Sequence, residues 1–99
     1  MSTQDQELKV EIKFDEQTAT GVFSNFANIT HSPEEFIMDF LFINPAPPAG
    51  FGKLMSRVVL TPGHMKRLAA AINENIARYE EHFGEIRVAE NPSGNSPVQ

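Results

Sequence analysis

The segment from Thr61 to Gly84 constrains the fold more than any other part of the sequence. Threonine is a favoured N-cap, and Pro62 fits the first helical position without losing a needed donor. Apolar residues then recur at spacings of three and four, and Gly84 follows as a candidate left-handed cap. The resulting stripe consists of Met65, Leu68, Ala69, Ile72, Ile76, Tyr79 and Phe83. The pattern predicts an amphipathic helix over residues 62–83 with Ile72 in the middle of a buried stripe.

Two strands are predicted near the start of the chain. Apolar and charged residues alternate strictly over residues 8–14, which is typical of a half-buried strand. A polar turn is expected at residues 15–17, and a second strand from Thr20 to about Thr30. The alternation is broken within residues 24–28, where an extra residue in a β-bulge would restore one apolar face.

Two further strands are predicted before the helix. Residues 36–43 are apolar on both faces, which is typical of a central strand covered on both sides. The prolines of residues 44–52 cannot donate to a ladder, so this stretch is expected to be an extended loop. Strand pairing is expected to resume over residues 53–60, and a short terminal strand is possible in residues 85–90.

These elements predict the α+β class, with an antiparallel sheet of about four strands packed against one long C-terminal amphipathic helix. A chain of 99 residues has room for one domain, which we place at residues 8–90. Residues 1–7 form a polar N-terminal segment, and residues 91–99 are expected to be a disordered tail. A domain of this size leaves much surface exposed to water, so association with another chain would stabilise it.

Composition narrows the classes of function. A net charge of −5 argues against a general affinity for nucleic acid or anionic lipid. The absence of cysteine excludes thiolate nucleophiles, disulfides and Cys-ligated zinc. No apolar stretch approaches the roughly 20 residues of a membrane span, and residues 1–7 lack the features of a signal peptide. We therefore expect a cytoplasmic protein without a membrane partner.

No motif for catalysis or for a cofactor is found. The histidines His31, His64 and His82 lack the paired spacing of a metal-binding helix. The glycines of residues 50–52 lack the ending of a P-loop, and no serine lies in a nucleophile elbow. We expect a non-enzymatic protein with no catalytic residue, cofactor or metal, although a site formed at a subunit junction would leave no trace in the sequence.

Two charged features stand out. Asp39 interrupts an apolar strand face and would need a partner if covered, for which Arg57 on the next strand is the expected candidate. Basic residues also concentrate near the predicted start of the helix, where exposed amides favour an anion. They are Lys53, Arg57, Lys66 and Arg67. Binding of nucleic acid or another anion by these four residues is the alternative function, disfavoured by the acidic net charge.

The main functional hypothesis rests on the strand predicted over residues 36–43, which is apolar on both faces. One helix cannot cover both faces of a sheet. A second copy of the chain is the simplest way to cover the remaining face, and a dimer is expected. Two alternatives stay open. The face could be covered by another protein, or by the proline-rich loop and the terminal segment of the same chain. The predicted interaction residues are Phe36, Met38, Phe40, Phe42, Ile37, Leu41 and Phe51. We predict an oligomeric protein-interaction domain, either chaperone-like or an accessory subunit.

Several short motifs carry a family resemblance. They are Phe23-Ser24-Asn25, Ser32-Pro33-Glu34-Glu35-Phe36 with Asp39-Phe40, Ser56-Arg57-Val58-Val59-Leu60-Thr61-Pro62, Lys66-Arg67-Leu68, Asn75, Tyr79-Glu80 and Phe83-Gly84-Glu85-Ile86. Together they resemble DUF3467, a family of small bacterial and archaeal proteins known only as a domain of unknown function. The family supplies no activity and no catalytic residues. In plan, the order of elements also resembles SecB-type export chaperones, which are oligomers that hold unfolded polypeptide.

Overall fold

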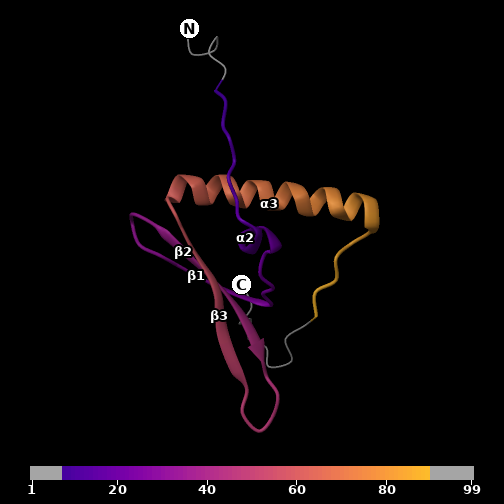
Figure 1. Cartoon of the computed structure of the whole chain (residues 1–99). Helices are drawn as coiled ribbons and strands as arrows, with labels where there is room; N and C mark the ends of the chain where they lie inside the picture. Colours follow the sequence, from indigo (N-terminus) through magenta and orange to yellow (C-terminus); the bar gives the residue numbers. More distant parts are fainter. Residues whose placement is uncertain (1–7, 90–99) are drawn as a thin grey trace.

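A computed structural model describes residues 8–89 of the chain (Figure 1). The elements in chain order are α2 (Glu16–Thr20), β1 (Phe26–His31), β2 (Phe36–Asn44), β3 (Phe51–Leu60) and α3 (Pro62–Phe83). The strands form one antiparallel sheet in the order β1-β2-β3, so the α+β class with a C-terminal helix is confirmed. The predictions for residues 1–7 and 91–99 lie outside the described residues.

The third predicted strand is β2, and it is central as expected. In the register of the sheet, Asp39 lies between Asn28 of β1 and Arg57 of β3. The irregularity in the sheet falls between β2 and β3, where Phe40 pairs with Ser56 and Leu41 pairs with Leu54. The predicted bulge within residues 24–28 is therefore wrong, and the extra residue is in β3.

Just before β1 begins, two side chains form hydrogen bonds to the backbone of β2. The Asn25 amide donates to the carbonyl of Ile43 at 3.0 Å and accepts from its N–H at 2.9 Å, which imitates a ladder pair. The Ser24 hydroxyl donates to the carbonyl of Leu41 at 3.0 Å. These contacts replace the backbone pairing that the predicted strand start at Thr20 would have supplied.

The N-terminal predictions need two corrections. Asp15 caps a short helix rather than opening a turn, because its Oδ1 accepts from the N–H of Thr18 at 2.7 Å. This helix, α2, ends before Gly21, whose φ of 80° favours glycine. The strand predicted over residues 8–14 is not formed, because none of the strands in the described part of the chain pairs with it. The sheet therefore has three strands rather than four among the described residues.

The helix α3 has the predicted bounds. The Thr61 hydroxyl accepts from the N–H of His64 at 3.2 Å, as expected of an N-cap. Gly84 has the positive φ of 95° that its prediction required, although its ψ of 169° lies outside the left-handed helical region. The Glu80 carboxylate then accepts from the N–H of Ile86 at 3.0 Å. Residues 85–89 contain no strand, so the described part of the predicted terminal strand is wrong.

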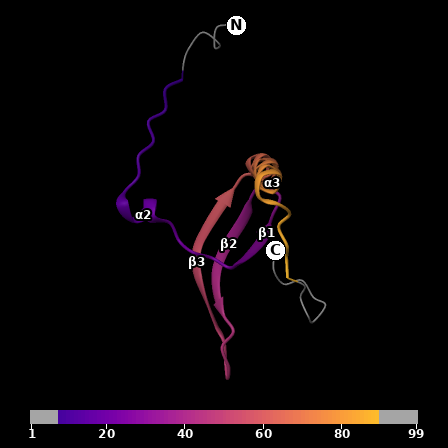
Figure 2. The same cartoon turned by 90° about the vertical axis from the view of Figure 1, so that its right-hand side faces the viewer.

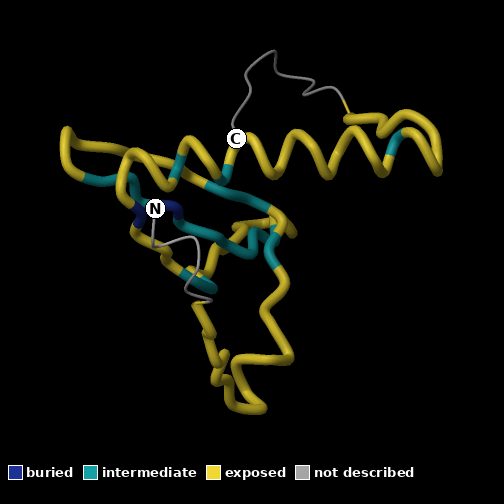
Figure 3. The backbone as a smooth tube through the Cα atoms, turned by 90° about the horizontal axis from the view of Figure 1, so that it is seen from above, coloured by how far each residue is buried: buried dark blue, intermediate teal, exposed yellow. Residues whose placement is uncertain are grey.

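The core is very small. Only two large apolar residues within residues 8–89 are buried, Met38 at 8% and Leu60 at 9% exposure. Figures 1 and 3 show α3 crossing one end of the sheet and continuing past it, while Figure 2 shows α2 beside β3. Met65 and Leu68 near the start of α3 are half-buried, and no residue of this helix is buried. The helix therefore contacts its own sheet through its first turns only.

Candidate interaction surfaces

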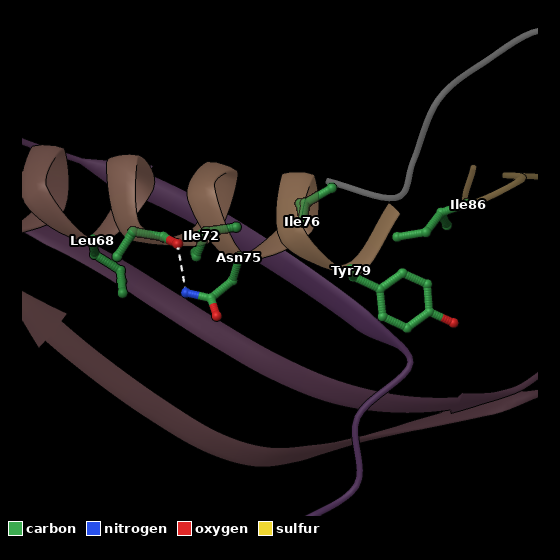
Figure 4. Close-up of a pocket in the computed structure, with 7 residues that line it drawn as sticks. Leu68, Ile72, Asn75, Ile76, Tyr79 and Ile86 are labelled. Atoms are coloured by element: carbon green, nitrogen blue, oxygen red, sulfur yellow. Dashed lines mark hydrogen bonds between the residues drawn. The ribbon is translucent and has the colours of Figure 1, made fainter. Parts of the chain in front are cut away.

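An open apolar groove runs along α3 (Figure 4). Its volume is about 480 Å³, and its lining residues are Leu68, Ala71, Ile72, Asn75, Ile76, Tyr79 and Ile86. The single polar amide among them is already engaged, because Asn75 Nδ2 donates to the carbonyl of Ala71 at 2.9 Å. The groove offers no charged group and suits an apolar side-chain row better than a polar ligand.

The groove corrects the prediction of a buried stripe. Ile72 is 44% exposed, Ile76 is 42% exposed and Phe83 is 75% exposed. Tyr79 packs on Phe83 with ring centroids 5.0 Å apart, so the aromatic end of the stripe contacts itself rather than the sheet. The periodicity correctly identified the residues that share a face. It does not say whether that face is covered within one chain.

The predicted interaction residues of β2 are mostly half-buried, and Met38 is buried. Hydrogen-bonded neighbours on both sides limit the exposure of this strand, so β2 offers less free surface than predicted. Phe51, at the start of β3, is 58% exposed and lies 6.3 Å from Phe42, measured between ring centroids. Phe23 also packs edge-on against Phe42, with ring centroids 6.2 Å apart. The exposed member that the sequence reasoning missed is Phe23, at 68%.

Residues 8–14 carry the most exposed apolar row in the described chain. Leu8, Val10, Ile12 and Phe14 are 71% to 87% exposed, and the charged residues between them are exposed as well. Alternating rows of this kind are stable when one row is covered and the backbone is paired with another strand. Neither condition is met by the other residues that the structure describes.

The expected pair of Asp39 and Arg57 is formed. Arg57 Nε donates to Asp39 Oδ1 at 2.6 Å, and Arg57 Nη2 donates to Asp39 Oδ2 at 3.0 Å. These hydrogen bonds lower the pKa of Asp39 below its usual 3.8 and raise the pKa of Arg57. The Asp39 side chain is 17% exposed, against 57% for Arg57. The carboxylate is fully engaged in a cross-strand pair, which is a structural role.

The four predicted anion-binding residues do not form one patch. Lys53 lies at the loop end of β3, about 23 Å along the strand from Leu60, after which α3 begins. Arg57 donates to Asp39, so its guanidinium is already partnered. Only Lys66 and Arg67 are neighbours, in the first turns of α3. The structure thus gives the alternative function little support.

The histidines lie apart from one another and have ordinary local contacts. Residues 8–89 contain no cluster of three or more potential metal ligands. His31 stacks at a tilt on Phe36 with ring centroids 5.5 Å apart, and His82 Nδ1 lies 3.0 Å from the carbonyl of Arg78. None of the helices in the described part is long and apolar enough to cross a membrane.

These features define a small α+β domain with large uncovered apolar surfaces. A family model matches residues 1–88 and carries the description "Protein of unknown function (DUF3467)". The chain therefore belongs to the DUF3467 family, as its motifs indicated. No curated protein and no solved structure matches the chain. The looser likeness in plan to SecB-type chaperones stays a prediction.

Proposed function

We propose that this chain is a non-enzymatic, oligomeric protein-interaction domain whose fold is completed by a second copy of itself. The observation that carries the proposal is the small core. Met38 and Leu60 are the only large apolar side chains that are buried within residues 8–89. A domain of this size is only marginally stable even with a full core, so burial of further apolar surface against a second chain would stabilise it.

The exposed area is large enough for a stable interface. Within residues 8–89, seventeen large apolar residues are at least 38% exposed. A standard interface removes only about 800 Å² from each partner, which this apolar surface readily supplies.

Residues 8–14 would form the missing fourth strand in such an assembly. The outer sides of β1 and β3 pair with no other described strand. An open edge exposes N–H and C=O groups that a further strand satisfies. We propose that residues 8–14 add to an open edge of the second copy, which would cover the row from Leu8 to Phe14 and leave Lys9, Glu11 and Lys13 in water.

The first experiment measures mass and strand formation together. We expect light scattering at micromolar concentration to give a dimer or a larger oligomer. Hydrogen exchange of the amides of residues 9–13 should slow as protein concentration rises, because these amides become paired only on assembly. The amides of α2 serve as the internal control, since their bonds form within one chain. A monomer at micromolar concentration that brings no partner from its native host would refute the proposal.

A further inference from the structure

The two open edges of the sheet differ in how well they are protected against a further strand. β3 carries an extra residue at its irregularity, and it also carries Lys53 and Arg57. Bulges and basic side chains of this kind discourage pairing at an edge. β1 has a regular register with β2 and contains no proline, lysine, arginine or carboxylate. The outer edge of β1 is therefore the less protected of the two.

The helix α2 distinguishes the two edges further. Gln17 and Thr18 of α2 line a hollow together with Ser56 of β3, and Figure 2 shows α2 beside this strand. Residues 8–14 precede α2 and lead away from the sheet (Figures 1 and 2). The β1 strand of the same chain lies at the opposite edge of the sheet. The β1 edge of a second copy can meet residues 8–14 without their crossing the sheet of their own chain.

The side chains of β1 form one apolar row and one polar row, as those of residues 8–14 do. Ile29 pairs with the buried Met38, so the face of β1 that carries Ile29 is the core face. Asn28 and Thr30 alternate with it and are exposed on the other face. A strand added beside β1 would place its apolar row against Ile29, which is still 39% exposed, and its charged row beside Asn28 and Thr30. The apolar row is Leu8, Val10, Ile12 and Phe14, and the charged row is Lys9, Glu11 and Lys13.

The edge of β3 offers no such match. Near its end, Val58 and Leu60 lie on one face and Val59, which is 54% exposed, lies on the other. The charged row of residues 8–14 would lie against apolar side chains whichever face it joined. We infer that residues 8–14 of one copy pair with the outer edge of β1 in a second copy; this deepens the proposed function and rests on it. In a two-fold dimer the exchange is reciprocal, so each sheet gains its fourth strand from the other copy.

Cross-linking between single-cysteine variants tests which edge is used, since the chain has no cysteine of its own. Glu11→Cys marks the middle of residues 8–14, where the direction of the added strand matters least. Thr30→Cys marks β1 and Val59→Cys marks β3. Thr30 and Val59 both pair with Ile37, so they are matched positions on the two sides of the sheet. Each cysteine lies in only one of the mixed chains, so a mixed product can form only between two copies.

Full-length Glu11→Cys protein is mixed with either of the other variants and treated with a short bis-maleimide, and mass spectrometry measures the linked peptides. We expect the product with Thr30→Cys to exceed that with Val59→Cys about tenfold or more, because the added strand lies about 5 Å from β1 and about 14 Å from β3. In the unmodified chain, those β1 amides that donate to no β2 carbonyl should exchange more slowly as protein concentration rises. The exchange of the β3 edge amides should change little.

Three results would contradict these expectations. An oligomer in which Glu11→Cys links to Val59→Cys as readily as to Thr30→Cys, or to neither, would overturn the assignment to β1 and leave the proposed oligomer intact. A link within a monomer of the double variant E11C/T30C would overturn the exchange between copies. A wild-type chain that stays monomeric at every concentration would instead refute the proposed function itself.

Discussion

The strand β2 and the helix α3 each carry a row of large apolar side chains, yet they differ in how far the chain covers these rows. Every residue of β2 is buried or half-buried, although each of its faces carries large side chains. No residue of α3 is buried, and its stripe ends with Phe83 at 75% exposure. The strand is enclosed by its hydrogen-bonded neighbours, whereas the helix has only its first turns on the sheet.

This difference separates two kinds of information in an apolar pattern. Periodicity identifies which residues share a face, since it follows from the geometry of the backbone. The cover of that face depends on which other elements reach it. β2 is covered because β1 and β3 are joined to it by short connections, but 22 residues of α3 extend well beyond a three-stranded sheet. In the proposed function, the exposed stripe of α3 is a surface that a second copy would cover.

The largest effect is expected for Ile72→Asp. In the proposed oligomer, the change would place a carboxylate in the apolar stripe of each copy and remove an apolar contact worth about 1.5–3 kcal/mol from each. We expect the dissociation constant to rise at least about a hundredfold, measured by sedimentation. Ala70→Asp, on the opposite side of the same helix, is the matched control. Equal loss of association in both variants would show that helix stability, rather than the stripe, is responsible.

A smaller effect is expected for Leu60→Ala, which tests the buried core of the sheet. Leu60 is one of the two buried core residues, and a cavity at such a site costs about 2–4 kcal/mol in free energy of unfolding. Its neighbour Val59 is 54% exposed, so Val59→Ala should cost less than about 1 kcal/mol. Urea unfolding at one fixed protein concentration compares the two. A large cost at Val59 would mean that the assembly covers both faces of β3.

The sequence was most informative where one short segment determines the outcome. The bounds of α3 follow from Thr61, Pro62 and Gly84, which act within one or two turns of the helix ends. The pair of Asp39 and Arg57 also followed from the pattern, because a charged residue on an apolar strand face requires a partner nearby. These predictions needed no knowledge of distant parts of the chain.

The errors arose where the outcome depends on competing local bonds or on other chains. The Asp15 cap of α2 has a recognisable signal, an N-cap residue followed by Gly21 as the stop, but a polar run of this kind also predicts a turn. The bulge could not be placed, because it depends on how β2 and β3 align. Residues 8–14 carry a genuine strand pattern, but they pair with neither open edge of the described sheet. The groove along α3 could not be predicted, since periodicity alone does not reveal an uncovered face.

The smallest effect is expected for Asp39→Asn, which tests the polar contact within the covered sheet. Hydrogen bonds from Arg57 hold the pKa of Asp39 below 3.8 in the folded protein. The folded state therefore binds this proton less readily than the unfolded state, and the pair stabilises the fold above the unfolded pKa. That contribution is lost as the pH falls through the folded pKa. Because Arg57 is 57% exposed, water and salt screen the pair and keep the effect small.

The free energy of unfolding should therefore differ between wild type and Asp39→Asn by a constant amount from neutral pH to about pH 5, and the difference should shrink below about pH 4. Urea unfolding at several pH values measures it. Glu74→Gln removes an exposed pair within α3 and is the matched control for a charge change outside the sheet. If the difference in free energy of unfolding is still as large at about pH 2, the amide substitution disturbs the packing of β2 itself. The Asp39 side chain would then stabilise the fold through its shape rather than its charge.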